Sequence, residues 1–110
     1  MIPKHVIVGG RTYEVRSDQD GSGQLRDRDN KGETYIDRLI IRVDGDLPPA
    51  LIRETLLHEV MHAAWNMVGL HRAGLTNEQE EQVITALSPA LTEVWRNNPE
   101  LRDYVLAVDR

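Results

Sequence analysis

Short clusters of β-branched residues mark the first half of the chain, and a helical period marks the second half. Two such clusters, residues 4–8 and 12–15, are separated by Gly9 and Gly10, which suit a two-residue turn because glycine adopts positive φ without strain. The pattern predicts a β-hairpin there. Residues 35–43, with the sequence YIDRLIIRV, predict one further strand.

A polar segment rich in glycine, residues 17–33, separates the hairpin from that strand. Apart from one leucine it lacks apolar residues, so we expect it on the surface, with a short strand near residues 24–27. Two pieces of it, residues 18–23 and 27–32, resemble calcium-binding loops in the spacing of their oxygen-bearing side chains. Both lack the final glutamate and the flanking helices of such loops, so we interpret them as Asp/Gly turns.

Helices are predicted throughout the second half of the chain. Pro48 and Pro49 favour a helix start because proline is tolerated in the first turn, and Gly69 favours the end of that helix. Thr76 and Gln79 have the spacing of a capping box, which begins a second helix. The predicted helices cover residues 48–68, 76–96 and 98–106.

This order of elements predicts an α+β fold with one domain, residues 1–110. We expect a small N-terminal sheet, made of the hairpin and an edge strand, to pack on the first helix. A second, acidic helix and a short C-terminal helix follow. A chain of 110 residues buries enough surface for one hydrophobic core but not for two domains.

Composition narrows the possible functions. The chain has 13 Lys and Arg against 18 Asp and Glu, a net charge of −5, which argues against a nucleic-acid partner because phosphate contacts need a basic face. It has no Cys, so any metal site must use His, Asp or Glu. No apolar run is long enough for a signal peptide or a membrane span, so we expect a cytoplasmic protein without a membrane partner.

The first predicted helix contains three polar residues in an otherwise apolar stretch, residues 55–65. They are His58, Glu59 and His62. Burial of a polar group without a partner costs roughly 1–3 kcal/mol, and a metal ion would supply that partner. The two histidines lie one helical turn apart, so both imidazoles can reach one zinc ion. Glu59 lies beside them, near a water in an open coordination position.

The segment TLLHEVMHAA resembles the active-site helix of the zincin metallopeptidases. This resemblance implies that His58 and His62 bind zinc and that Glu59 is the catalytic base. The order of elements over about residues 35–105 is similar to that of small zincin-like proteins encoded by phages and prophages. Such a protein would hydrolyse peptide bonds in a peptide or protein substrate, and a phage-encoded one would act in the host-cell cytoplasm.

A catalytic zinc site needs a third protein ligand, and the second helix begins with three glutamates. Its apolar face is assigned to Val83, Ile84, Leu87, Leu91 and Val94. Glu80 shares that face, Glu78 points mostly away, and Glu81 lies beside it. Gluzincins take their third ligand, a glutamate, from the helix after the motif helix, which matches this layout. The shared apolar face favours Glu80 as that ligand, with Glu81 as the alternative. His71 lies in a glycine-flanked loop and is interpreted as a solvated turn residue.

In the mechanism that these residues imply, Glu59 takes a proton from a zinc-activated water and returns it to the leaving amine. The sequence does not choose the side chain that stabilises the oxyanion, for which Tyr35, His71, Arg72 and Tyr104 are available. By resemblance to zincins, the substrate would pair with residues 39–43 as an exposed sheet edge. The alternative function is a catalytically inactive zinc-binding interaction domain of phage or prophage origin. The oligomeric state is not predicted.

Overall fold

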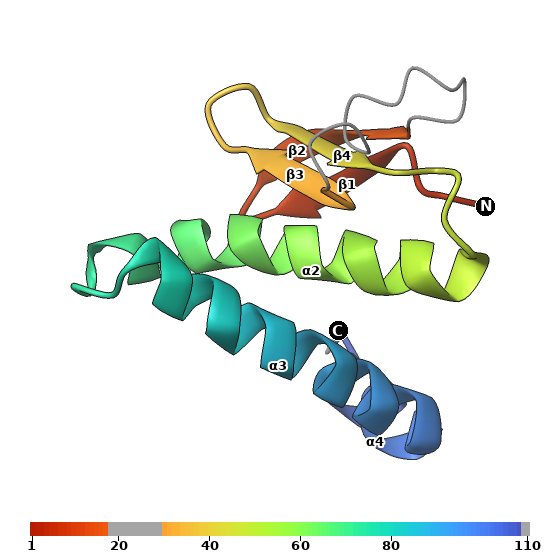
Figure 1. Ribbon diagram of the computed structural model, residues 1–110. Helices are drawn as coiled ribbons and strands as arrows, with labels where there is room; N and C mark the ends of the chain where they lie inside the picture. The colour runs from red at the N-terminus through yellow and green to blue at the C-terminus, as the bar shows by residue number, and fades with distance from the viewer. Residues whose placement is uncertain (18–29, 109–110) are drawn as a thin grey trace.

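The computed structural model describes residues 1–17 and 30–108 and has an α+β fold, as the sequence predicts (Figure 1). Its elements are β1 (His5–Val8), β2 (Arg11–Ser17), β3 (Gly32–Tyr35), β4 (Ile40–Val43), α2 (Pro49–Met67), the 3₁₀ turn η1 (Leu70–Arg72), α3 (Asn77–Asn97) and α4 (Pro99–Val105). The strand predicted at 24–27 and most of the calcium-like segments lie outside the described residues. None of the helices in the described part has the length and apolar character that crossing a membrane requires.

The described strands form one mixed sheet in the order β1-β2-β4-β3. The predicted hairpin is confirmed: β1 and β2 pair antiparallel, and Gly9 and Gly10 between them have φ of 60° and 80°. β2 then pairs in parallel with β4, and β4 pairs antiparallel with β3. The parallel pair joins the N-terminal hairpin to the rest of the sheet.

The single strand predicted over residues 35–43 is wrong, because the chain turns in the middle of it. Residues 36–39 form a turn in which Leu39 has a φ of 56°, and Asp37 and Arg38 are exposed. These two polar residues interrupt the apolar run and lie at the tip of a β3–β4 hairpin. β4 is therefore an inner strand, so residues 39–43 do not form the exposed edge that the sequence predicts. Both edge strands, β1 and β3, contact α2, and β3 packs on it more extensively.

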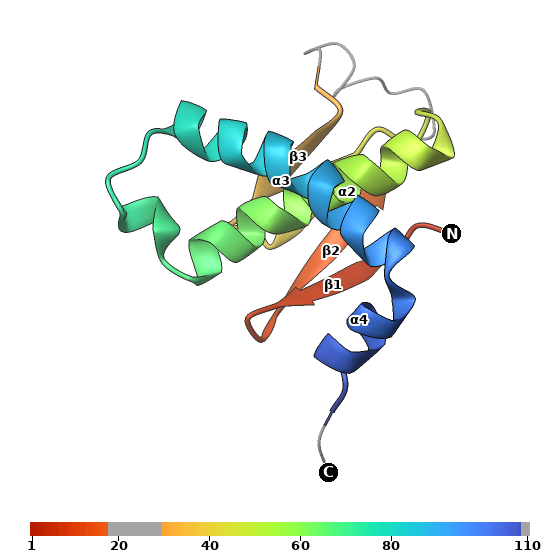
Figure 2. The same cartoon turned by 90° about the horizontal axis from the view of Figure 1, so that it is seen from below.

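The helix α2 lies between the sheet and α3, as Figures 1 and 2 show from two directions. Its inner face packs on a core made of Val8, Tyr13, Ile41, Val43 and Ala63. Ile41 and Val43 of the inner strand β4 are fully buried. Because α2 has neighbours on two sides, polar residues in its middle need partners inside the protein.

The face of α3 that packs on α2 differs from the predicted one. Ile84 and Ser88 are its buried residues. The Ser88 hydroxyl donates a hydrogen bond of 2.7 Å to the carbonyl of Ile84 and lies 3.1 Å from Sδ of Met61 on α2. Four residues assigned to the inner face are 36–50% exposed, namely Val83, Leu87, Leu91 and Val94. A serine on the inner face made this side of the helix look polar in the sequence.

Candidate metal centre

The middle of α2 carries His58 and His62 on the side that faces α3. Their side chains are 20% and 18% exposed. The two Nε2 atoms are 3.2 Å apart, and the ring centroids are 4.9 Å apart. Spacing of four residues on a helix brings the rings together in this way, as the sequence predicts.

Glu81 of α3 faces both imidazoles. Its Oε1 lies 2.7 Å from Nε2 of His58, and its Oε2 lies 2.9 Å from Nε2 of His62. These three residues offer ligand atoms that all lie within 4.8 Å of one another. Zinc held at about 2.0–2.1 Å by tetrahedral ligands separates those ligands by about 3.3 Å, close to the 3.2 Å between the two nitrogens. The donor set therefore fits a zinc ion.

Glu80 lies on the other side of the His62 ring. Its Oε2 is 2.5 Å from Nδ1 of His62, and its side chain is 20% exposed. A proton on Nδ1 satisfies this contact and leaves the Nε2 lone pair free for a metal. The structure thus brings Glu81, rather than Glu80, to the two Nε2 atoms. Glu81 precedes the buried residues Ile84 and Ser88 by three and seven positions, so it shares their face of α3.

Glu59 is 6% exposed and lies between α2 and the edge strand β3. The Thr34 hydroxyl of β3 is 2.8 Å from the Glu59 carboxylate Oε1 and 3.0 Å from the Glu59 carbonyl oxygen, so it can donate to either. Burial raises the pKa of the Glu59 carboxyl, and the Thr34 hydrogen bond and the imidazoles of His62 and His58 oppose that rise. This environment suits a carboxyl that accepts and returns a proton.

The charge of the cluster also favours a cation. Three carboxylates, those of Glu59, Glu80 and Glu81, lie around two imidazoles that carry no charge in their metal-binding form. The negative charges of neighbouring carboxylates repel one another. A divalent cation bound at the two Nε2 atoms would offset that repulsion. The arrangement can therefore hold a metal and place a carboxyl beside it.

Two hollows lie on either side of Glu59, along the edge of β3. The first, of about 440 Å³, is lined by Glu59 and His62 together with Tyr35 and His71. The second, of about 310 Å³, is lined by His58, Glu59 and Glu81 together with Lys31. Tyr35 and His71 thus share a hollow with the cluster, whereas the other two oxyanion candidates, Arg72 and Tyr104, line neither hollow.

Thr34 is the residue of the site that sequence reasoning missed. It lies 25 positions before Glu59 and reaches it only because β3 runs along α2. The sequence placed residue 34 at the border between the polar segment and the predicted strand, where a threonine carries no specific signal. The pairing of β3 with β4 in the register Thr34↔Ile41 is what places its hydroxyl there.

Comparison of the chain with protein-family models, with curated proteins and with solved structures gives no match. Function is therefore inferred from the geometry of this site.

Proposed function

We propose that the chain is a zinc-dependent metallopeptidase in which His58, His62 and Glu81 hold the metal and Glu59 is the general base. The observation that supports this most directly is the convergence of two imidazole Nε2 atoms and one carboxylate on one point, with a second carboxyl buried beside them. Three protein ligands leave one coordination position open, as in catalytic zinc sites. Glu80 orients the His62 ring through Nδ1.

Zinc bound here would supply Lewis acidity, which makes a water more acidic and polarises a carbonyl. Glu59 then accepts a proton from the attacking water. Burial raises the pKa of the Glu59 carboxyl and so favours its protonated form. In the next step Glu59 gives that proton to the leaving amine. Thr34 holds the Glu59 carboxyl in place. Tyr35 and His71, which line the same hollow as Glu59, are the candidates to donate to the oxygen that becomes negative.

The proposed substrate is an extended peptide that pairs with β3. One side of β3 pairs with β4, and its other side is the sheet edge that runs past Glu59 between the two hollows. An added strand at this edge would gain backbone hydrogen bonds from β3, and its side chains would enter the hollows. We propose the cytoplasm as the location.

The alternative is a zinc-binding interaction domain without hydrolytic activity. Its support is the burial of Glu59, whose carboxyl is bonded to Thr34 and whose side chain is largely out of contact with solvent. In this alternative the Glu59 carboxyl connects β3 with α2 and takes no part in hydrolysis. Replacement of Glu59 separates the two functions.

The test combines metal analysis with cleavage of an unfolded protein substrate, with fragments read by mass spectrometry. We expect wild type to bind one zinc per chain and to cleave the substrate. Glu59→Gln keeps the shape of the side chain, so it should keep zinc and lose about 10²–10⁴-fold in rate. Glu93→Gln, an exposed change on α3, is the matched control and should behave as wild type.

Three outcomes decide between the proposals. Wild-type cleavage by the Glu59→Gln variant would contradict the role of Glu59, and absence of zinc binding by wild type would contradict both functions. Zinc binding without cleavage of any substrate by wild type would favour the inactive interaction domain.

A further inference from the structure

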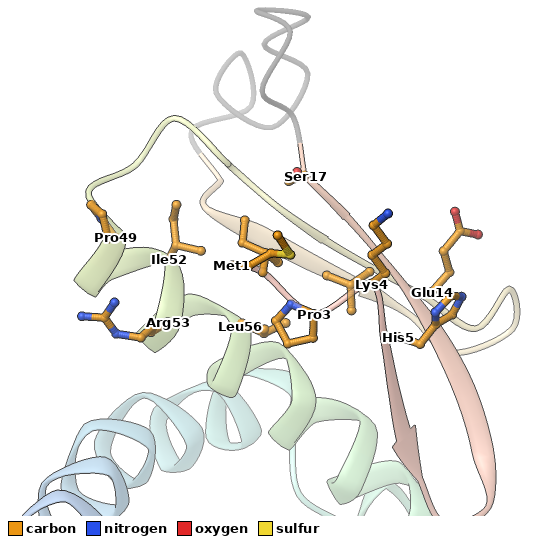
Figure 3. Close-up of a pocket in the computed structure, with 12 residues that line it drawn as sticks. Met1, Pro3, Lys4, His5, Glu14, Ser17, Pro49, Ile52, Arg53 and Leu56 are labelled. Carbon is orange, nitrogen blue, oxygen red and sulfur yellow. The ribbon is translucent and has the colours of Figure 1, made fainter.

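A groove at the start of α2 is separate from the candidate metal centre. It has a volume of about 780 Å³ and lies between the N-terminal segment, β2 and the first turns of α2 (Figure 3). Its apolar lining includes Ile2, Val15, Ile52 and Leu56. Arg53 of α2 stands on one side, and Lys4 and Glu14 stand on the opposite side. We call this the N-terminal groove. None of the candidate metal ligands lines it.

The helix α4 carries an apolar face that stays exposed. Leu101, Tyr104 and Val105 are 46%, 83% and 54% exposed. Their spacing of i, i+3 and i+4 is typical of the apolar face by which an amphipathic helix binds in an apolar groove. A helix of seven residues is not stable on its own, and the packing partner that the described chain gives α4 is the neighbouring helix α3. A partner for this face would stabilise the helix.

The groove and α4 lie at the same end of the molecule, where α2 begins and α3 ends. Figures 1 and 2 show the N-terminus and α4 there in both views. A two-fold axis near this end would let each of two chains place its α4 in the groove of the other and close the assembly. We propose that the N-terminal groove binds α4 of a second copy of this chain, in a symmetric dimer.

The charges at the edges of the two surfaces match. Glu100 lies about 90° around α4 from the centre of its apolar face, so it flanks that face. Arg53 is exposed on the rim of the groove and makes no ion pair with another described residue. A helix in the groove can pair Glu100 of one chain with Arg53 of the other, which favours one orientation of the helix. The groove thus complements α4 in polarity and charge.

The test is sedimentation of the full chain from low to high micromolar concentration. Wild type should change from 12.5 kDa to twice that mass as concentration rises. Tyr104→Asp should raise the dimer dissociation constant about 30-fold or more, because each dimer loses two aromatic contacts. Arg53→Glu should also weaken association. Val68→Asp, which changes a residue 61% exposed at the other end of α2, is the control and should associate as wild type.

A mixing experiment separates helix-in-groove exchange from other dimers. Each homodimer of Tyr104→Asp or Arg53→Glu has two damaged contacts, whereas their heterodimer keeps one intact helix in one intact groove. Mixing should therefore restore part of the association. An Arg53→Glu variant that associates as wild type would contradict binding of α4 in the N-terminal groove. It would indicate instead that the two α4 helices pair with each other. A wild type that stays monomeric would contradict the proposal.

Discussion

Glu80 and Glu81 are adjacent in the sequence, yet the structure predicts different losses of zinc affinity when each is removed. Glu81 faces both Nε2 atoms, at 2.7 and 2.9 Å, and so Glu81→Ala removes one of three ligands. Glu80 touches the metal site only through Nδ1 of His62, at 2.5 Å. Loss of a carboxylate that orients a ligating histidine costs typically 10–100-fold in metal affinity. That range corresponds to about 1.4–2.7 kcal/mol.

We therefore expect Glu80→Ala to weaken zinc binding by about 10–100-fold and Glu81→Ala to weaken it by clearly more than about 100-fold. Competition with a fluorescent zinc chelator measures both constants. Glu78→Ala is the matched control, because Glu78 is an exposed carboxylate in the same first turn and touches neither histidine. Thermal unfolding of the variants without zinc shows whether they fold. A larger loss for Glu80→Ala than for Glu81→Ala would refute the assignment of Glu81 as the ligand.

Two further predictions concern the way α3 is placed. Ile84→Ala removes a fully buried side chain between α3 and α2 and should cost about 2–5 kcal/mol in the free energy of unfolding, whereas Val83→Ala, 38% exposed, should cost less than about 1 kcal/mol. Urea unfolding measures both, and equal costs would contradict the observed face of α3. Thr76→Ala removes the N-cap of α3 and should lower the free energy of unfolding by about 1 kcal/mol. It should also weaken zinc binding, because the first turn of α3, which carries Glu80, would fray. Glu93→Ala, an exposed change further along α3, is its control and should keep zinc affinity.

The local features of the chain were predictable, because short-range chemistry determines them. The hairpin at Gly9 and Gly10 follows from the backbone freedom of glycine, and the start of α3 follows from a capping box. His58 and His62 likewise lie on one face of α2 because residues four apart on a helix are neighbours, which is a local property of the helix. Each of these signals spans five residues or fewer.

The features that depend on contacts between distant segments were not predictable. The run YIDRLIIRV contains enough apolar residues for one strand, and only pairing with β2 and β3 determines that it turns at residues 36–39. The inner face of α3 was misassigned because Ser88 lies on it, held by its own hydrogen bond to the helix backbone. That misassignment led to the preference for Glu80 over Glu81.

His58, His62 and Glu81 come together although the strand predicted over residues 35–43 is wrong, because the joint between α2 and α3 has its own local signals. Gly69 has a φ of 83° just after the end of α2, and Thr76 accepts a hydrogen bond of 3.1 Å from the backbone N–H of Gln79 at the start of α3. These two positions determine where Glu80 and Glu81 stand along α3, one turn after the cap. A start shifted by one residue would rotate both glutamates by about 100° and take Glu81 away from the histidines. The distance between the candidate ligands therefore depends on this joint more than on the order of the strands.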